Sequence, residues 1–185
     1  MSNKIRISKF LSMVLRHKPH RIGIQLDENG WADVSSIIAG LGKNGYRVNM
    51  SMLEEIVATC DKKRFSFNED KTKIRANQGH SIDIDLGLDA VQPPHVLYHG
   101  TAQSSTKSIL KQGLLKRKRH HVHLSLDRET ALAVGRRHGI PVILVIDSRA
   151  MHQDGYSFYV SDNGVWLTDE VPVRYISELA DKKSR

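Results

Sequence analysis

The sequence predicts an α+β fold in two parts, a helical N-terminal part followed by a strand-rich C-terminal part. Two observations support this prediction. Apolar residues recur at helical spacing in several segments before residue 61, whereas short apolar runs bounded by turn residues dominate from residue 96 onward. Between them a polar stretch ends in Pro93 and Pro94, and paired prolines stiffen a linker. We therefore expect domains at 1–88 and 95–185.

The N-terminal part is expected to contain three helices and a hairpin. Ser8 is placed to cap a first helix, which the chain leaves before Pro19. Asp33 opens a second helix, and Ser51 with Glu54 forms a capping-box pattern at the start of a third. A short alternating strand is expected within 24–31, and strands at 65–67 and 73–76 are expected to form the hairpin. Three helices followed by a hairpin is the element order of a winged-helix module, a class that commonly binds nucleic acid.

The C-terminal part is expected to be a mixed, strand-rich α+β domain with two helices. One helix covers 104–112 and is closed by Gly113, and the other begins after Asp127, which caps it. The apolar run 142–146 predicts a buried strand, and Asn163-Gly164 predicts a hairpin turn. The remaining strands are expected at 96–99, 122–125, 158–160, 165–167 and 171–176.

Charge and hydropathy limit the class of binding partner and the cellular compartment that we expect for the protein. Among 185 residues, 28 Lys and Arg stand against 20 Asp and Glu, so the formal net charge is +8 and the sequence pI is about 9.7. An anionic partner is expected, with nucleic acid ahead of acidic membranes. Apolar runs fall short of the ~20 residues that span a bilayer, and the N-terminus lacks the apolar core of a secretory signal. We expect a cytoplasmic protein with no membrane association.

Cys60 is the single cysteine, which rules out an intramolecular disulfide and fits a reducing compartment. It lies at helical spacing from Leu53, Ile56 and Val57, so we interpret it as a buried structural thiol rather than a nucleophile.

A metal site is not expected, although His120, His121 and His123 lie close together in the sequence. With one cysteine and no His-Glu-x-x-His spacing, the chain lacks the usual zinc ligand sets. Glycine-rich loops of the Walker or dinucleotide-binding kind are also absent from the sequence. Strand alternation instead places His121 and His123 on one face, which is polar enough to line a cleft.

Arginines follow several predicted helices. Arg16 and His17 end an apolar stripe that contains Phe10 and Met13, Arg64 follows the third helix, and Arg136-Arg137 follow the helix that Asp127 caps. A guanidinium binds phosphate through two parallel charged hydrogen bonds, which favours phosphate chemistry without a metal. Taken singly, each arginine is more often a solvated charge or a partner of the helix dipole. Spacing alone leaves open whether they meet.

A set of motifs runs in the order of one known family over nearly the whole chain. On these motifs the chain resembles the RNA 2'-phosphotransferase family, the NAD-dependent tRNA 2'-phosphotransferases of the KptA type that are best known from tRNA splicing. The motifs are LSMVLRHKP at 11–19, DKKRF at 61–65, IRANQGHS at 74–81, LYHGT at 97–101, HVHLS at 121–125, GRR at 135–137 and NGVWLT at 163–168.

The resemblance implies an N-terminal winged-helix lobe that binds RNA and a C-terminal lobe with the ADP-ribosyltransferase fold that binds NAD. It also implies a two-step reaction with NAD as co-substrate. An internal 2'-phosphate of the RNA attacks the nicotinamide-bearing ribose carbon of NAD and expels nicotinamide. The neighbouring ribose hydroxyl then attacks phosphorus, which releases RNA with a 2'-hydroxyl and ADP-ribose 1''-2''-cyclic phosphate.

The family's catalytic Arg-His-Arg-Arg set matches Arg16, His17, Arg64 and Arg137, with a one-residue shift to Arg136 left open. Three guanidiniums can neutralise the phosphate through both steps. A histidine with a reference pKa of about 6.5 can move the proton of the attacking hydroxyl or of the leaving ribose oxygen. The roles of Arg75, Gln78 and His80 are left open.

The NAD-binding residues implied by the resemblance all lie in the C-terminal part. His99, Gly100 and Thr101 match a segment that contacts the nicotinamide-side ribose and the amide. Ser125 matches the residue beside the nicotinamide and follows His123 in the histidine motif, while Gly113 and Leu114 border the adenosine. Many protein-modifying relatives carry a glutamate near the final hairpin, where this chain has the segment 165–168. That glutamate can serve as a base, which a nucleophile that is already an anionic phosphate does not need.

We therefore expect a monomeric enzyme whose partners are NAD and RNA that carries an internal 2'-phosphate. Two alternatives remain. One is a transferase that stops after ADP-ribosylating nucleic-acid phosphates or another acceptor. The other is a non-catalytic winged-helix protein that binds nucleic acid, which would have no need of the 99–101 motif in a separate lobe.

Overall fold

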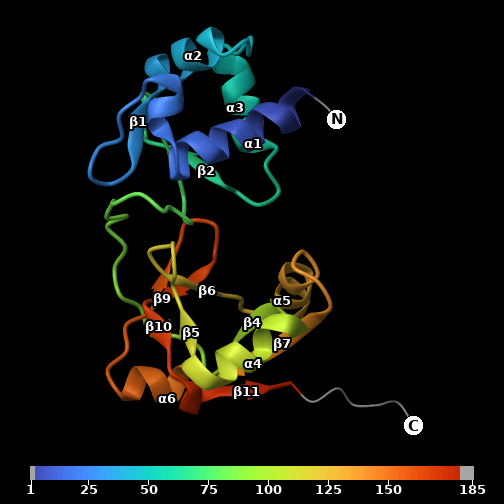
Figure 1. The fold of residues 1–185 in the computed structure, drawn as a ribbon. Coiled ribbons are helices and arrows are strands. Elements are labelled where there is room, and N and C mark those ends of the chain that lie inside the picture. Colours follow the sequence, from blue (N-terminus) through green and yellow to red (C-terminus); the bar gives the residue numbers. More distant parts are fainter. Residues whose placement is uncertain (1–2, 180–185) are drawn as a thin grey trace. The chain divides into compact units, whose positions relative to one another are not determined.

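The structure, a computed structural model, describes residues 3–179. The chain divides into two compact units, residues 1–88 and 89–185, and helices and small antiparallel sheets occur in both (Figure 1). The predicted α+β class is therefore confirmed. No helix in the described part of the chain is long and apolar enough to cross a membrane.

The first unit is built on a three-stranded antiparallel sheet with strand order β1-β3-β2. Trp31 pairs with Arg75 on one side of β3, and Phe65 pairs with Ala76 on the other. A core that includes the buried Leu11, Ile37 and Leu53 joins the three helices to this sheet. The elements are α1 Asn3–Arg16, the 3-10 helix η1 Pro19–Ile22, β1 Trp31–Asp33, α2 Val34–Lys43, α3 Met50–Ala58, β2 Phe65–Phe67 and β3 Lys73–Ala76.

Two helix starts in this unit differ from the prediction. Helix α1 begins at Asn3, so Ser8 lies inside the helix and does not cap it. Residues 3–7 contain no proline or glycine that would stop the helix from extending toward the N-terminus. Helix α3 is capped by Asn49, whose side chain accepts from the Met52 amide, rather than by Ser51. Asn caps a helix as well as Ser does, so the pattern at Ser51 competed with an equally good signal two residues earlier.

The strand expected within 24–31 forms only at its last residue, where β1 starts. The Asp27 carboxylate accepts hydrogen bonds from the backbone amides of Asn29 and Trp31, and Gly30 adopts φ +79°. A side chain that caps its own turn in this way competes with strand pairing.

The predicted cap of α2 is confirmed, because the Asp33 carboxylate accepts from the Ser36 amide at 2.8 Å.

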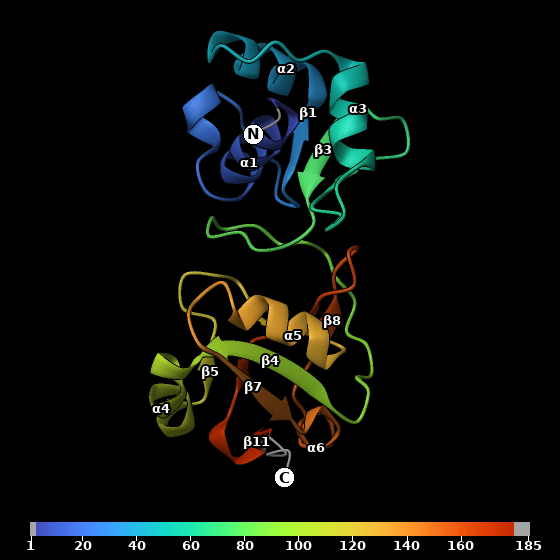
Figure 2. The same cartoon turned by 90° about the vertical axis from the view of Figure 1, so that its right-hand side faces the viewer.

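The second unit holds three small sheets, ordered β11-β7-β4, β6-β9-β8 and β10-β5. Helix α5 packs on β4 (Figure 2), so closely that a Cβ at Gly100 would lie 1.6 Å from the Ala131 carbonyl oxygen. The elements are β4 Leu97–Ala102, α4 Gln103–Gln112, β5 Leu114–Leu115, β6 Val122–Leu124, α5 Arg128–Gly135, β7 Pro141–Ile146, α6 Ser148–Gln153, β8 Tyr159–Val160, β9 Trp166–Thr168, β10 Glu170–Val171, the 3-10 helix η2 Val173–Tyr175 and β11 Ile176–Glu178.

Two predictions for this unit are corrected. A third helix, α6, begins after Asp147, whose side chain accepts from the Ala150 amide, and its six residues are too few to show helical periodicity. The single strand expected at 171–176 is divided into β10, η2 and β11. Pro172 lies at the division, and a proline has no N–H to continue a strand ladder.

Candidate functional site

The C-terminal end of α1 presents Arg16 and His17, and Ser81 contacts both residues. The Ser81 amide donates to the Arg16 carbonyl at 3.0 Å, and its hydroxyl oxygen lies 2.9 Å from His17 Nδ1. His17 is exposed and Arg16 is half-buried. The contact with Ser81 therefore fixes the position of the Nδ1 side of the His17 ring.

The turn that carries Arg64 is held by Asn77. The Asn77 amide donates to the Arg64 carbonyl at 2.9 Å, and its side-chain Nδ2 donates to the Lys63 carbonyl at 2.8 Å. Lys63 has φ +40°, a left-handed conformation that costs a non-glycine residue about 1 kcal/mol. The buried Asn77 therefore stabilises a strained turn just before Arg64.

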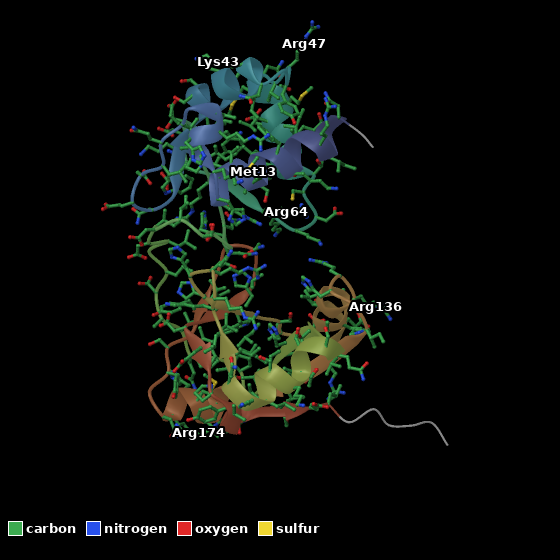
Figure 3. All side chains as sticks on the ribbon, viewed as in Figure 1. Met13, Lys43, Arg47, Arg64, Arg136 and Arg174 are labelled. Atoms are coloured by element: carbon green, nitrogen blue, oxygen red, sulfur yellow. The ribbon has the colours of Figure 1, made fainter. Side chains whose placement is uncertain are left out.

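Segment 77–81 thus connects the three functional residues predicted in the first unit. At one end Asn77 holds the backbone of Arg64, and at the other Ser81 holds Arg16 and His17. Asn77 is 3% exposed and His80 is 1% exposed, which anchors the segment between its two contacts. Arg64 lies at the end of this unit away from Lys43 and Arg47 (Figure 3).

Cys60 contacts Arg64 as well. Arg64 Nη1 donates to the Cys60 sulfur at 3.3 Å. Burial raises the pKa of the thiol, but hydrogen bonds from the Arg64 backbone and guanidinium outweigh it, so the pKa lies below its ordinary value. Cys60 is half-buried and follows the C-cap of α3, so the predicted buried structural thiol is corrected to a partly exposed neighbour of Arg64.

The structure also places the residues of this unit whose roles the sequence left open. The Arg75 guanidinium carbon lies 4.5 Å from the centroid of the Trp31 ring, and Nη1 donates to the Leu86 carbonyl at 3.4 Å. His80 is buried beside Gly30, and Gln78 is half-buried. Arg75 and His80 thus both make contacts within the first unit.

In the second unit, the structure brings His99, His123 and Ser125 together. Tyr98 and Ser125 exchange backbone hydrogen bonds of 2.9 and 2.7 Å, which join β4 to the end of β6. His99 Nδ1 lies 3.0 Å from the His123 carbonyl oxygen. A carbonyl only accepts, so Nδ1 carries the proton and the Nε2 lone pair of neutral His99 is left as an acceptor.

His99 is also electrostatically distinct. Burial lowers the pKa of its imidazole below the ordinary value, while the hydrogen bond to the His123 carbonyl opposes the shift. The positive charges of Arg119 and His138 lower the pKa further. His99 therefore stays neutral to lower pH than an exposed histidine does.

Arg119 is a functional candidate that the sequence reasoning missed. Its Nη1 donates to His123 Nδ1 at 3.1 Å, and its charge acts on His99. Within the basic run 116–119 it looked like any solvated lysine or arginine. Its position four residues before His123 was the signal that could have selected it.

Arg137 lies in the turn after α5, and its amide donates to the Val134 carbonyl. The last helical residue, Gly135, packs on β4, where an added Cβ would lie 2.9 Å from the Thr101 carbonyl oxygen. The turn therefore reaches the neighbourhood of His99, since His138 acts on the His99 pKa. Figure 3 shows Arg136 on the outer side of α5, away from β6. Arg137 itself is exposed.

Leu114 belongs to a different sheet from His99, and Gly113 directly precedes it. Gly113 ends α4 with φ +82°, and an added Cβ would lie 2.4 Å from the Val171 carbonyl oxygen, so packing alone requires glycine there. Leu114 is buried in β5. The next residues border an open groove of about 640 Å³ that is lined by Leu115, Lys116, Arg117, Gly155, Tyr156, Ser157, Thr168, Asp169 and Glu170.

Metal ligands do not gather in the part of the chain that the structure describes. Residues 3–179 contain no group of three or more His, Cys, Asp or Glu side chains placed to hold an ion. His121 instead lies against the Tyr159 ring, with centroids 5.5 Å apart, and His123 accepts from Arg119.

Comparisons with known proteins agree with the motifs. The family described as "RNA 2'-phosphotransferase, Tpt1 / KptA family" matches residues 2–170. A protein of Flavobacterium johnsoniae named "Probable RNA 2'-phosphotransferase" is 57% identical over 170 residues, covering 92% of this chain and 93% of its own. Proteins with the same name from Burkholderia pseudomallei and Trichormus variabilis are 56% and 51% identical, over 92% and 95% of this chain and 93% and 96% of theirs. The chain therefore belongs to the RNA 2'-phosphotransferase family.

Proposed function

We propose that this protein removes an internal 2'-phosphate from RNA by transferring it to NAD. The observation that carries the proposal is the anchoring of Arg16, His17 and Arg64 to the single segment 77–81. Two guanidiniums and an imidazole on one rigid scaffold suit a phosphate that must be bound and then transferred. Membership of the RNA 2'-phosphotransferase family supports the same conclusion.

The two units are assigned to two lobes. The order α1, β1, α2, α3, β2, β3, with an antiparallel sheet that ends in a hairpin, supports a winged-helix lobe at 1–88. The small antiparallel sheets with α5 on β4 support an ADP-ribosyltransferase-like lobe at 95–185. The first lobe is assigned to RNA and the second to NAD.

In the first step, an oxygen of the RNA 2'-phosphate forms a bond to the nicotinamide-bearing ribose carbon, and the bond from that carbon to nicotinamide breaks. Arg16 and Arg64 are assigned to hold the phosphate dianion, which is already a nucleophile and needs no general base. Their task in this step is orientation, because the phosphate must approach the ribose carbon opposite the departing nicotinamide.

In the second step, the neighbouring ribose hydroxyl attacks phosphorus and the bond from phosphorus to the RNA 2'-oxygen breaks. One proton leaves the attacking hydroxyl and one is gained by the RNA oxygen, and His17 is assigned to this transfer. Negative charge on the phosphoryl oxygens must be supported at the same time. Arg137 is assigned to that role by its place in the family motif, with Arg119 as the competing guanidinium of the same unit.

NAD binding is assigned to the residues around His99. The unprotonated Nε2 of His99 is an acceptor for a ribose hydroxyl, and the hydrogen bond to His123 keeps the ring in that tautomer. Gly100 and Thr101 continue β4 from His99, and Ser125 is joined to the same strand through Tyr98. Gly113 and Leu114 are assigned to the adenosine, beside the groove at residues 115–117. The proposed partners are thus NAD and 2'-phosphorylated RNA. The protein is proposed to act on them as a monomer in the cytoplasm.

An RNA with one internal 2'-phosphate, incubated with the protein with and without NAD, tests the proposal. We expect the phosphate to be lost only when NAD is present, with one nicotinamide released for each phosphate removed. Loss of the phosphate without NAD, or its retention despite NAD, would contradict the proposal. Persistent ADP-ribosylated RNA as the final product would instead favour a transferase that stops after the first step.

A further inference from the structure

Four side chains on the first unit form a continuous stack of charged and aromatic groups. The Phe10 and Tyr46 rings are stacked with centroids 4.8 Å apart and an interplanar angle of 29°. Arg6 lies over the Tyr46 ring at 5.4 Å, and Arg21 lies over the Phe10 ring at 5.6 Å. We call Arg6, Phe10, Arg21 and Tyr46 the α1 stack. Both of its guanidiniums are exposed.

The chain segment that supplies Arg6, Phe10 and Arg21 carries charged residues of one sign only, and one of them, Lys4, pairs with Glu55 of α3. Residues 1–26 contain no Asp or Glu, and the basic residues in that range are Lys4, Arg6, Lys9, Arg16, Lys18 and Arg21. Within residues 3–179, neither guanidinium of the stack forms an ion pair, whereas Lys71 and Lys73 pair with Glu54 and Asp27 at 2.7 and 3.0 Å. The stack therefore holds two positive charges that no carboxylate neutralises.

Stacking also fixes where these charges lie. An exposed arginine normally loses side-chain entropy when it binds an anion. A guanidinium that already lies on an aromatic ring has lost part of that freedom, and the N–H groups at its edge stay available for a phosphate. An arginine that only covered an aromatic ring would have no need of a charge left without a carboxylate partner. The charges of Arg6 and Arg21 therefore favour an anionic ligand.

Two members of the α1 stack, Arg6 and Phe10, lie on α1, which ends at Arg16, and His17 follows directly. The His17 amide still donates to the Met13 carbonyl, so the spacing of four and seven residues places Arg6, Phe10 and His17 on one side of the helix axis. With a rise of 1.5 Å per residue, Arg6 lies about 15 Å along the axis from Arg16. A single RNA strand whose 2'-phosphate lies at Arg16 and His17 can therefore place neighbouring backbone phosphates beside the stack.

We infer that the α1 stack binds backbone phosphates of the RNA strand that flanks the 2'-phosphorylated nucleotide. This inference rests on the proposed function. The stack contributes affinity without reading sequence, because guanidinium contacts to phosphate carry no base information. It is a binding surface for long substrates and plays no part in the chemical steps.

The test compares two substrates, an oligonucleotide with a central 2'-phosphate and a dinucleotide with the same 2'-phosphate. Arg6→Gln and Arg21→Gln should each raise the KM for the oligonucleotide about 5-fold at low salt, and leave kcat and the dinucleotide KM unchanged. Each should also make the plot of log KM against log salt concentration shallower by about 0.7, the value expected for one lost contact to a single strand.

Lys73→Gln is the matched control, because it removes a basic side chain of the same unit whose charge Asp27 already neutralises. It should leave both KM values unchanged.

Arg6→Lys keeps the charge and should keep most of the salt dependence, which separates charge loss from a folding defect. Equal KM increases on both substrates, or no change on the oligonucleotide, would overturn the inference while the wild-type activity still supports the proposed function. Inactivity of the wild-type protein on both substrates would overturn the proposed function itself.

Discussion

Ser81 holds His17 and Arg16 at the same time, with its hydroxyl oxygen 2.9 Å from His17 Nδ1 and its amide donating to the Arg16 carbonyl at 3.0 Å. These two contacts link segment 77–81 to the end of α1. Since the same segment holds the Arg64 turn through Asn77, the end of α1 and the distant Arg64 turn depend on one short piece of chain.

Ser81→Ala should lower kcat about 5-fold and leave the KM for NAD unchanged. The hydroxyl orients the His17 ring, and loss of a side-chain hydrogen bond of about 1 kcal/mol allows the ring to rotate away from its productive position. Ser81→Thr keeps the hydroxyl and should restore most of the rate. Steady-state kinetics over a range of pH measures both variants. A rate for Ser81→Ala equal to that of the wild type, or failure of Thr to restore a lowered rate, would show that the contact does not position His17.

Asn77→Ala should reduce the free energy of unfolding by about 1–2 kcal/mol, because it removes the donor to the Lys63 carbonyl inside a buried environment. It should also raise the KM for RNA, since the strained turn at Lys63 presents Arg64. Chemical denaturation and kinetics measure the two effects. Asn77→Asp has nearly the same volume but turns an acceptor toward the carbonyl, and it should be more damaging than Ala. If Asp were better tolerated than Ala, cavity formation rather than the hydrogen bond would explain the loss.

His99 should make stability depend on pH in a defined window. Its pKa is lowered in the folded protein, first by burial, so between the unfolded value of about 6.5 and the lower folded value the unfolded chain binds more protons. The stabilisation from neutral His99 is complete above pH 6.5 and is lost as the pH falls through that window. Urea unfolding at several pH values measures it. His99→Gln should flatten the pH dependence there, and an unchanged slope would contradict the assignment.

Arg119 and Arg137 compete for one role, and single substitutions can separate them. The arginine that supports charge on phosphorus should, when changed to Ala, slow breakdown of the ADP-ribosylated RNA more than its formation, by 10²-fold or more. The other should change the rate only a few-fold, and Arg136→Ala serves as the exposed control from the adjacent position. Single-turnover kinetics with labelled RNA resolves the two steps. If neither variant accumulated the intermediate, neither guanidinium would act in the second step.

Local signals predicted most of the elements, and the elements that were predicted wrongly differ because of other local features. The caps at Asp33 and Asp127, the hairpin strands β2 and β3, and the C-cap at Gly113 are confirmed, because each depends on residues a few positions apart. The predicted start of α1 at Ser8 was wrong because no proline or glycine in residues 3–7 stops the helix, and the predicted cap of α3 at Ser51 was wrong because Asn49 is an equally strong signal.

Site residues were harder to predict than elements. The family motifs selected His99 and Ser125, which the structure joins to β4 and β6. Ser81 and Asn77 act through contacts between distant segments, which spacing in the sequence does not encode, whereas Arg119 contacts the His123 ring four residues away. Segment 77–81 was part of a motif, but its function as a shared support became visible only through its hydrogen bonds.

The fate of the removed phosphate is the most direct test of the central claim, that an RNA phosphate is transferred to NAD. RNA labelled with ³²P at its internal 2'-phosphate is incubated with the wild-type protein and NAD, and the labelled product is identified by chromatography and mass. The mechanism predicts that the label leaves the RNA attached to ADP-ribose as a cyclic phosphate, with one nicotinamide released per phosphate. Label released as inorganic phosphate with NAD intact would contradict it.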